Sequence, residues 1–317
     1  MVLLLICIIF LCLRSGTFFS KSFCIRGTAA GIMVVGVLIQ FLRLCGLFFY
    51  GQCWKLLGEW FLLDGLSGFM CIMTVMVCGM SVVCRDKDLS LKVGFFRIGF
   101  ELCIYLIILI CVLSFVVRSW MEFYFFFESS LVPTFWLILG WGYQPERLQA
   151  GVFMLIYTVC GSFPLLMILL WYYLELGRDC FCVSILVING QGIEELGLIG
   201  LSWVLLMLGF FIKLPVYFFH GWLPKAHVEA PLSGSMILAG VLLKLGGYGV
   251  IRIIAVFGMS LWITNVLVLS VAIIGGFICR LLCLVQRDVK ALIAYSSIGH
   301  IGLSLGGILS SLKSGVE

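Results

Sequence analysis

Charged residues are scarce in this 317-residue sequence. Asp, Glu, Lys and Arg make up 11% of it, against about a quarter in soluble domains. Hydrophobic residues make up 63%, and the mean hydropathy is +1.23. This composition excludes a soluble globular domain and indicates a polytopic membrane protein. The net charge of +5 comes from basic residues scattered between apolar runs, so nucleic acid is not indicated as a partner and membrane lipid is.

Motifs for several kinds of chemistry are also missing. None of the 15 cysteines forms a C-x-x-C pair, and most lie within apolar runs, so we interpret them as small hydrophobic residues. The stretch GILSSLKSG lacks the spacing of a phosphate-binding loop. Only three histidines are present, two of them near a helix end or in a loop, which argues against haem ligation. We therefore expect this chain to bind no metal and no cofactor.

Apolar runs of bilayer-spanning length recur along the chain. They predict an all-α fold, a polytopic bundle of about ten transmembrane helices. All six prolines fall between Pro133 and Pro231, so we expect the irregular backbone, and with it the functional site, in the central helices. The predicted segments are 1–13, 28–50, 62–84, 98–117, 120–142, 150–173, 196–220, 232–257, 260–279 and 289–310.

Two lysines lie inside successive apolar segments. Lys213 falls a little past the midpoint of its segment, Lys244 falls almost at the midpoint of the next, and Pro215 breaks the first helix just beyond Lys213. A cation at mid-membrane costs on the order of 3 kcal/mol, so such lysines usually face the bundle interior or a water-filled path. The pattern therefore predicts an ion path. The alternatives are structural salt bridges or ammonium groups that reach the membrane surface.

Glu128, in FYFFFESSLVPTFW, is the acidic residue that fits such a path. A buried carboxyl takes up a proton when it is alone and stays charged beside a lysine, so it can exchange protons as its neighbour's charge changes. The alternatives are a static ion pair or a carboxyl bonded to Ser129 or Ser130. Glu101 and Arg43 also lie within apolar runs, but near an end or a flexible neighbour, which favours structural roles.

The histidines differ in their surroundings. His300, in AYSSIGHIGLSLGG, is placed at membrane depth among apolar and small residues, and imidazole titrates near neutral pH, so we predict it as a relay residue. His227, predicted in a loop with Lys225 and Glu229, is interpreted as a packing or helix-capping residue. His220 stays undecided.

Three stretches carry a family resemblance. The chain closely resembles the antiporter-like, proton-pumping subunits of mitochondrial NADH–ubiquinone oxidoreductase (respiratory complex I). The resemblance is continuous over residues 120–310, looser over 60–118, and limited to hydrophobic segments over 1–59. QPERLQAG followed by the long KAHVEAP run favours the chain 4 family over its two sister families. The matching stretches are FYFFFESSLVPTFWLILGWGYQPERLQAG, KLPVYFFHGWLPKAHVEAPLSGSMILAGVLLKLGGYG and QRDVKALIAYSSIGHIG.

The resemblance implies a core membrane-arm subunit that translocates protons across the mitochondrial inner membrane, coupled to electron transfer from NADH to ubiquinone. It implies that this chain has no redox centre, and that other subunits handle NADH, FMN, the iron–sulfur clusters and ubiquinone. The implied partners are the other membrane-arm subunits, especially the sister antiporter-like subunits.

The resemblance also implies an antiporter-like fold with two inverted five-helix repeats. We accordingly divide the chain into N-terminal helices at 1–97, a first repeat at 98–257 with a broken helix near 213–222, and the truncated start of a second repeat at 258–317. By matching motif, Glu128 would tune Lys213 as a pair. Protons would then pass through Lys244 and His300 toward the second repeat, which makes these four the implied catalytic residues.

Two alternatives remain open. Members of the family continue beyond this chain, so we expect either a partial sequence, which we favour, or a shortened subunit whose exit path another chain completes. The alternative function is that of a subunit in a multi-subunit monovalent cation/proton antiporter, which shares HGWLP-type motifs. The run WGYQPERLQAG argues against this second function.

Overall fold

The structure is a computed structural model that describes residues 55–56, 60–89, 94–142, 145–177, 196–257 and 262–310. The predicted segments 1–13 and 28–50 lie outside these residues, as does Arg43. Each of the other eight predicted segments contains at least one helix. The helices are α3 (Gly65–Leu89), α4 (Gly94–Val116), α5 (Trp120–Ser129), α6 (Leu131–Trp141), α7 (Arg147–Leu176), α9 (Leu196–Lys213), α10 (Trp222–Glu229), α11 (Leu232–Ile237), α12 (Leu243–Phe257), α13 (Trp262–Cys283) and α14 (Val289–Leu309).

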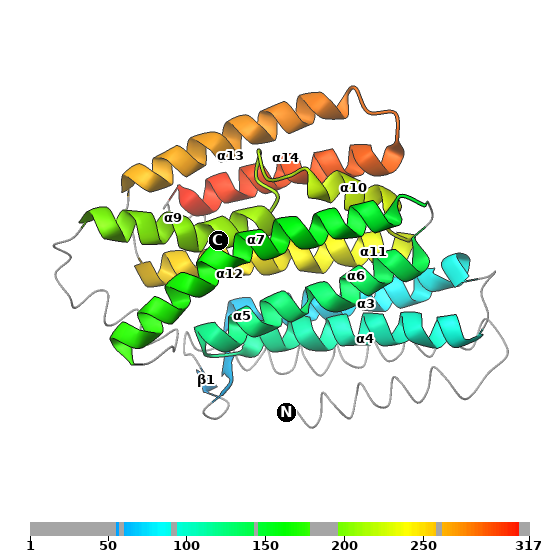
Figure 1. The fold of residues 1–317 in the computed structure, drawn as a ribbon, viewed down its shortest axis with the longest axis horizontal. Helices are drawn as coiled ribbons and strands as arrows, with labels where there is room; N and C mark the ends of the chain where they lie inside the picture. The colour runs from blue at the N-terminus through cyan, green and yellow to red at the C-terminus, as the bar shows by residue number, and fades with distance from the viewer. Residues whose placement is uncertain are drawn as a thin grey trace.

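The helices form one bundle in which most run roughly parallel to the long axis (Figure 1). α13 and α14 pack together along one edge, α3 to α6 lie along the opposite side, and α9 to α12 lie between them. The two short strands β1 (Lys55–Leu56) and β2 (Leu62–Leu63) pair antiparallel just before α3. The protein is therefore an all-α bundle over its described residues, apart from this two-stranded ribbon.

Seven spans in the described residues are long and apolar enough to cross a membrane, and a shorter apolar helix covers Trp203–Lys213. An α-helix satisfies every backbone group within one segment, which is why such runs fold as helices in lipid. The predicted polytopic transmembrane bundle is confirmed at this level. The spans are Gly65–Val82, Gly99–Val116, Trp120–Trp141, Arg147–Leu174, Leu232–Ala255, Val266–Cys283 and Val289–Leu309.

Three of these helices are irregular in the middle of the bundle. The run 120–141 breaks at Ser130, between α5 and α6. α9 ends at Lys213, two residues before Pro215, and the predicted segment 196–220 is therefore too long, because proline removes a helical hydrogen bond. The helix around Lys244 contains a π-helical stretch, η1 (Leu238–Leu242), between α11 and α12. Irregular turns of this kind are frequent at functional sites.

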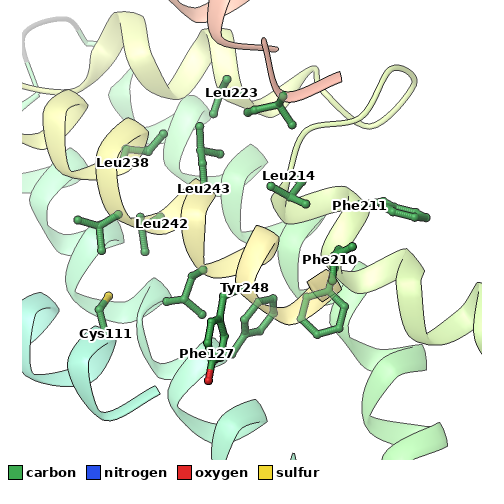
Figure 2. Packing of buried hydrophobic residues seen from close by; sticks show 14 of the residues in the cluster. Cys111, Phe127, Phe210, Phe211, Leu214, Leu223, Leu238, Leu242, Leu243 and Tyr248 are labelled. Carbon is green, nitrogen blue, oxygen red and sulfur yellow. The ribbon is translucent and has the colours of Figure 1, made fainter. Parts of the chain in front are cut away.

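Aromatic rings fill the core where α5, α9 and α12 meet. Phe123 stacks on Phe210 with 6.2 Å between ring centroids, and Phe127 meets Phe210 edge to face at 5.3 Å. Tyr248 of α12 joins them, 5.9 Å from Phe123. Figure 2 shows Phe127, Phe210 and Tyr248 in this core. Gly249 makes this packing possible, because a side chain there would collide with the Phe210 ring. These rings surround one end of the candidate site.

Candidate functional site

The site lies at the break between α5 and α6. Ser130 turns its hydroxyl back on the helix and donates to the Phe127 carbonyl at 2.7 Å. Thr134 donates in the same way to the carbonyls of Ser130, at 3.2 Å, and Leu131, at 2.9 Å. Pro133 has no N–H to give to the preceding turn. Hydroxyls that bond to backbone carbonyls and a proline thus lie together where the sequence FESSLVPT interrupts the helix.

Lys213 reaches this break from α9. Its side chain is buried, with 3% of the residue exposed. The Nζ atom donates to the Phe127 carbonyl at 2.5 Å and to the Ser130 hydroxyl at 3.4 Å, and it lies 3.3 Å from the centroid of the Phe127 ring. Neutral oxygens and a π-face therefore hold the ammonium group.

The end of α9 places Lys213 at this position. The ring of Pro215 stops the helix, and the Val216 N–H donates to the Phe211 carbonyl at 3.0 Å. Trp222, at the start of α10, donates its indole N–H to the Ile212 carbonyl at 2.9 Å. Carbonyls left open by the break thus find partners. A cation at a helix C-terminus is also favoured by the helix dipole.

Glu128 lies between the two acceptors of Lys213, one position after Phe127 and two before Ser130. Its side chain is half-buried, and Oε1 is buried without a hydrogen-bond partner. Glu128 and Lys213 are within electrostatic reach of each other, yet among the described residues no nitrogen–oxygen contact of 4 Å or less joins them. The structure brings the two residues together at one site, but the ammonium group rests on Phe127 and Ser130.

Lys244 and His300 lie elsewhere. Lys244 is the second residue of α12 and is exposed, although Leu243 and Leu245 on either side of it are buried. His300 is exposed on α14. We expected Lys244 to face the bundle interior or a water-filled path and His300 to lie at membrane depth among apolar and small residues. Both side chains are exposed in the described part of the chain, and their predicted roles stay predictions.

The other two histidines are buried to different degrees. His220 is half-buried and stacks on Tyr217, with 5.4 Å between ring centroids, and burial lowers its pKa. His227 is not in a loop, as predicted, but within α10, where 4% of it is exposed. Burial, and then the charge of Lys290, lower its pKa to about 4. Lys290 itself donates to the carbonyls of Val228, at 3.1 Å, and Ala230, at 2.9 Å, and so ties α14 to the end of α10.

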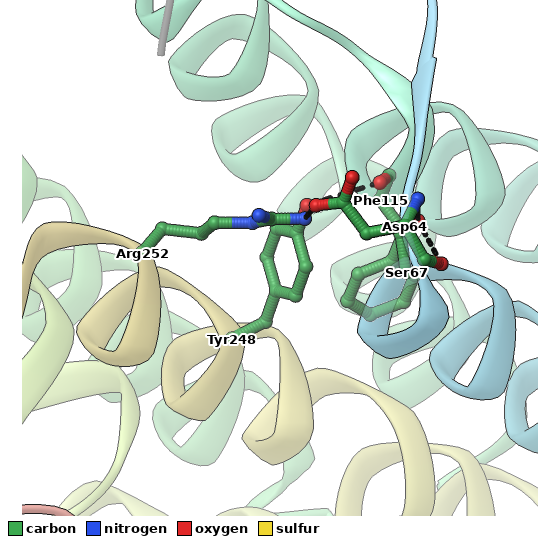
Figure 3. A network of polar contacts seen from close by, with 5 residues as sticks. All are labelled: Asp64, Ser67, Phe115, Tyr248 and Arg252. Atoms are coloured by element: carbon green, nitrogen blue, oxygen red, sulfur yellow. Dashed lines mark hydrogen bonds and ion pairs between the residues drawn. The ribbon is translucent and has the colours of Figure 1, made fainter. Parts of the chain in front are cut away.

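The prediction from sequence missed a second buried charged site. Arg252 of α12 pairs with Asp64, which precedes α3, and its guanidinium lies 4.9 Å from the centroid of the Tyr248 ring (Figure 3). The Tyr248 hydroxyl donates to the Phe115 carbonyl at 3.1 Å. The available signal was one acid and one base, each placed within or beside an apolar run. Glu101 is buried on α4.

No group of three or more His, Cys, Asp and Glu side chains in the described ranges is arranged to hold a metal ion. At the break, the described site offers hydrogen bonding and charge. A buried cation on neutral acceptors, with a carboxyl group nearby, can take up, hold and release a proton.

Comparison with known proteins places the chain in context. A family model described as "NADH:quinone oxidoreductase/Mrp antiporter, TM" matches residues 117–317. The NADH-ubiquinone oxidoreductase chain 4 of Lumbricus terrestris is 41% identical over 265 residues, which are 83% of this chain and 57% of that protein. The same-named protein of Mytilus edulis is 47% identical over 254 residues, 80% of this chain and 55% of that one. This chain thus spans about half the length of these relatives.

A solved structure shares the fold. A chain in the structure titled "Respiratory complex I from Thermus thermophilus with bound NADH" superposes with a TM-score of 0.74 at 23% sequence identity. The match covers 96% of this chain and 64% of that one. At this identity the similarity establishes the arrangement of the helices.

Proposed function

The chain belongs to the NADH:quinone oxidoreductase/Mrp antiporter transmembrane family, and we propose that it is a proton-translocating membrane-arm subunit of NADH–ubiquinone oxidoreductase, respiratory complex I. Its place is the mitochondrial inner membrane, among the other membrane-arm subunits. The names of the relatives support this assignment. NADH, FMN, the iron–sulfur clusters and ubiquinone belong to other subunits of the complex. Energy released by electron transfer from NADH to ubiquinone drives proton movement in this chain.

One observation carries the proton-relay proposal: the Lys213 ammonium is buried at a helix break beside Glu128 and is not locked to it. A lysine tightly paired with a carboxylate holds its proton firmly, because the opposite charge stabilises the ammonium form. A lysine on neutral acceptors responds when the nearby charge changes. Glu128 supplies that change as it gains or loses a proton. Lys213 then takes up or releases its own proton because the charge of Glu128 has changed.

Lys244 and His300 are the proposed next members of the relay. Their exposure in the described part of the chain fits groups that meet water or another protein segment along a path. The imidazole of His300 accepts a proton on one nitrogen and donates from the other, as a relay residue must. The division of the chain into two inverted repeats, the first at 98–257, belongs to the same proposal.

The test compares Lys213→Met and Glu128→Gln in the assembled complex, with Glu122→Gln as a matched control on the same helix. Glu122 lies in the first turn of α5, away from the break. We expect both site variants to lower proton translocation and quinone-coupled turnover together by about tenfold or more, since a positioned proton-transfer group contributes at least that much. Wild-type rates of proton translocation and of quinone-coupled turnover in both site variants, with the complex assembled, would refute the relay. Purification without flavin and iron–sulfur subunits would instead favour a cation/proton antiporter.

A further inference from the structure

Ser130 and the Phe127 carbonyl form a seat for the Lys213 ammonium group. We use "Ser130 seat" for these two oxygens. Ser130 is fully buried, its hydroxyl proton goes to the Phe127 carbonyl at 2.7 Å, and Lys213 donates to that same carbonyl at 2.5 Å. A hydroxyl group has one proton to donate and two lone pairs to accept with. The Ser130 oxygen therefore stays available to Lys213, from which it is 3.4 Å away.

The bond back to its own helix does not distinguish Ser130. Ser81 and Ser114 make the same bond to the residue three positions earlier, at 2.6 Å each. Ser129, the neighbour at the break, donates to the Phe126 carbonyl at 3.1 Å. Ser130 alone among these four also contacts the ammonium of Lys213. That contact joins residues 83 positions apart in the chain, so it depends on how α9 packs against the break.

We propose that Ser130 is a positioning residue that holds Lys213 away from Glu128 in the resting state of the site. The inference rests on the proposed function, because it assigns to the Ser130 seat the task of keeping the relay lysine responsive. The three donors of an ammonium group find strong partners in ionised acceptors and weaker ones in neutral acceptors. With the seat intact, Lys213 has a resting place that leaves Glu128 free to change its charge. Without the hydroxyl, the ammonium group moves onto the carboxylate and forms a closed ion pair.

The experiment measures proton translocation by the assembled complex in three variants. Ser130→Ala removes the hydroxyl, and Ser130→Cys keeps the bulk of the side chain but leaves only a weak acceptor. Ser129→Ala is the matched control, since it removes a hydroxyl from the same break without touching Lys213. We expect both Ser130 variants to lower the translocation rate about three- to tenfold, which corresponds to the usual net value of one hydrogen bond. Ser129→Ala should keep the wild-type rate.

The structure of the Ser130→Ala complex provides a second readout, which packing alone would not change. We expect the Lys213 Nζ atom within 4 Å of a Glu128 oxygen there, a distance that the wild type does not show. Should the alanine variant not assemble, the cysteine variant provides both measurements.

The outcomes separate this proposal from the one on which it rests. A Ser130→Cys complex that pumps at the wild-type rate would show that the side chain only fills space, and the positioning role would be wrong. Equal rates in Ser130→Ala and Ser129→Ala would refute it as well. In either case a Lys213→Met complex that fails to pump leaves the proposed function standing. A Lys213→Met complex that pumps normally refutes the proposed function first.

Discussion

Two cations, Lys213 and Arg252, are buried in the same helix bundle and are held in different ways. Arg252 has a carboxylate partner in Asp64 and lies against the ring of Tyr248. Lys213 has a carbonyl, a hydroxyl and a ring, and within the described residues no nitrogen–oxygen contact of 4 Å or less joins it to Glu128. A cation that is fully matched in charge tends to stay as it is. A cation held by neutral groups keeps the freedom to change its charge or its position. The difference therefore fits the proposal that Lys213 transfers protons while Arg252 has a structural role.

The largest effect should come from breaking the matched pair. Asp64→Asn leaves the Arg252 guanidinium buried without its counter-charge, which costs about 3–5 kcal/mol of stability. We expect the amount of assembled complex and its thermal stability to fall sharply. The double variant Asp64→Leu/Arg252→Met removes both charges and should recover part of that loss. If the Asp64→Asn complex assembles normally but does not pump protons, Arg252 has a role in proton transfer. The proposed difference in role between Arg252 and Lys213 would then be wrong.

His227 is a buried group that burial keeps uncharged, and we expect its effect on stability to be smaller than that of the Asp64–Arg252 pair. The pKa of His227 is lowered by burial, and further by Lys290, from 6.5 to about 4. Above pH 6.5 the native and unfolded chains both hold it neutral. Between pH 6.5 and 4 the unfolded chain takes up a proton that the native chain does not. The free energy of unfolding therefore decreases as the pH is lowered through this window, and it levels off below pH 4.

The loss traced to His227 should reach at most about 3 kcal/mol, since one pKa unit corresponds to about 1.4 kcal/mol. Thermal unfolding of wild type and His227→Gln, followed from pH 7 to pH 4, measures it. The wild type should lose more stability than the variant across the window. Parallel curves would mean that His227 is protonated in the native state, and that a third buried cation belongs in the comparison.

The smallest effect concerns the ring against which Arg252 lies. Tyr248→Phe keeps the aromatic contact with Arg252 and removes the 3.1 Å bond to the Phe115 carbonyl. We expect about 1 kcal/mol of lost stability, the usual net value of one hydrogen bond, and unchanged proton translocation. Reduced pumping at normal stability would mean that the Arg252 region takes part in proton transfer.

Most of the helices can be predicted from the sequence, because a long apolar run in lipid has few ways other than a helix to satisfy its backbone. The breaks are predictable where proline causes them, as at Pro215. The helix at Trp222–Glu229 is harder to see, since Pro224 and two charged residues suggest a loop. Proline is tolerated in the first turn of a helix, where the N–H groups have no partner within the helix, and here that turn includes Pro224.

The site itself is only half predictable. Lys213 and Glu128 stand out because ionisable groups are costly in apolar runs. The acceptors of Lys213 cannot be predicted in the same way. One of them is the main-chain carbonyl of Phe127, 86 positions away, and every residue has such a carbonyl whatever its side chain. The Asp64–Arg252 pair is hidden for a similar reason. An acid before an apolar run looks like an ordinary helix start. Only the fold, in which α12 packs against α4 and Asp64 lies just before α3, brings the arginine to it.

The π-helical stretch Leu238–Leu242 has a consequence for register. A π turn holds more residues than an α turn, so it sets which face every later residue of the helix presents. If these residues returned to α geometry with none of them removed, the rest of the helix would rotate by about 100°, the angle of one residue. Tyr248 and Arg252 would leave the core, and Lys244 would turn to a different face. The π geometry of this stretch thus determines which side chains of α12 face the neighbouring helices.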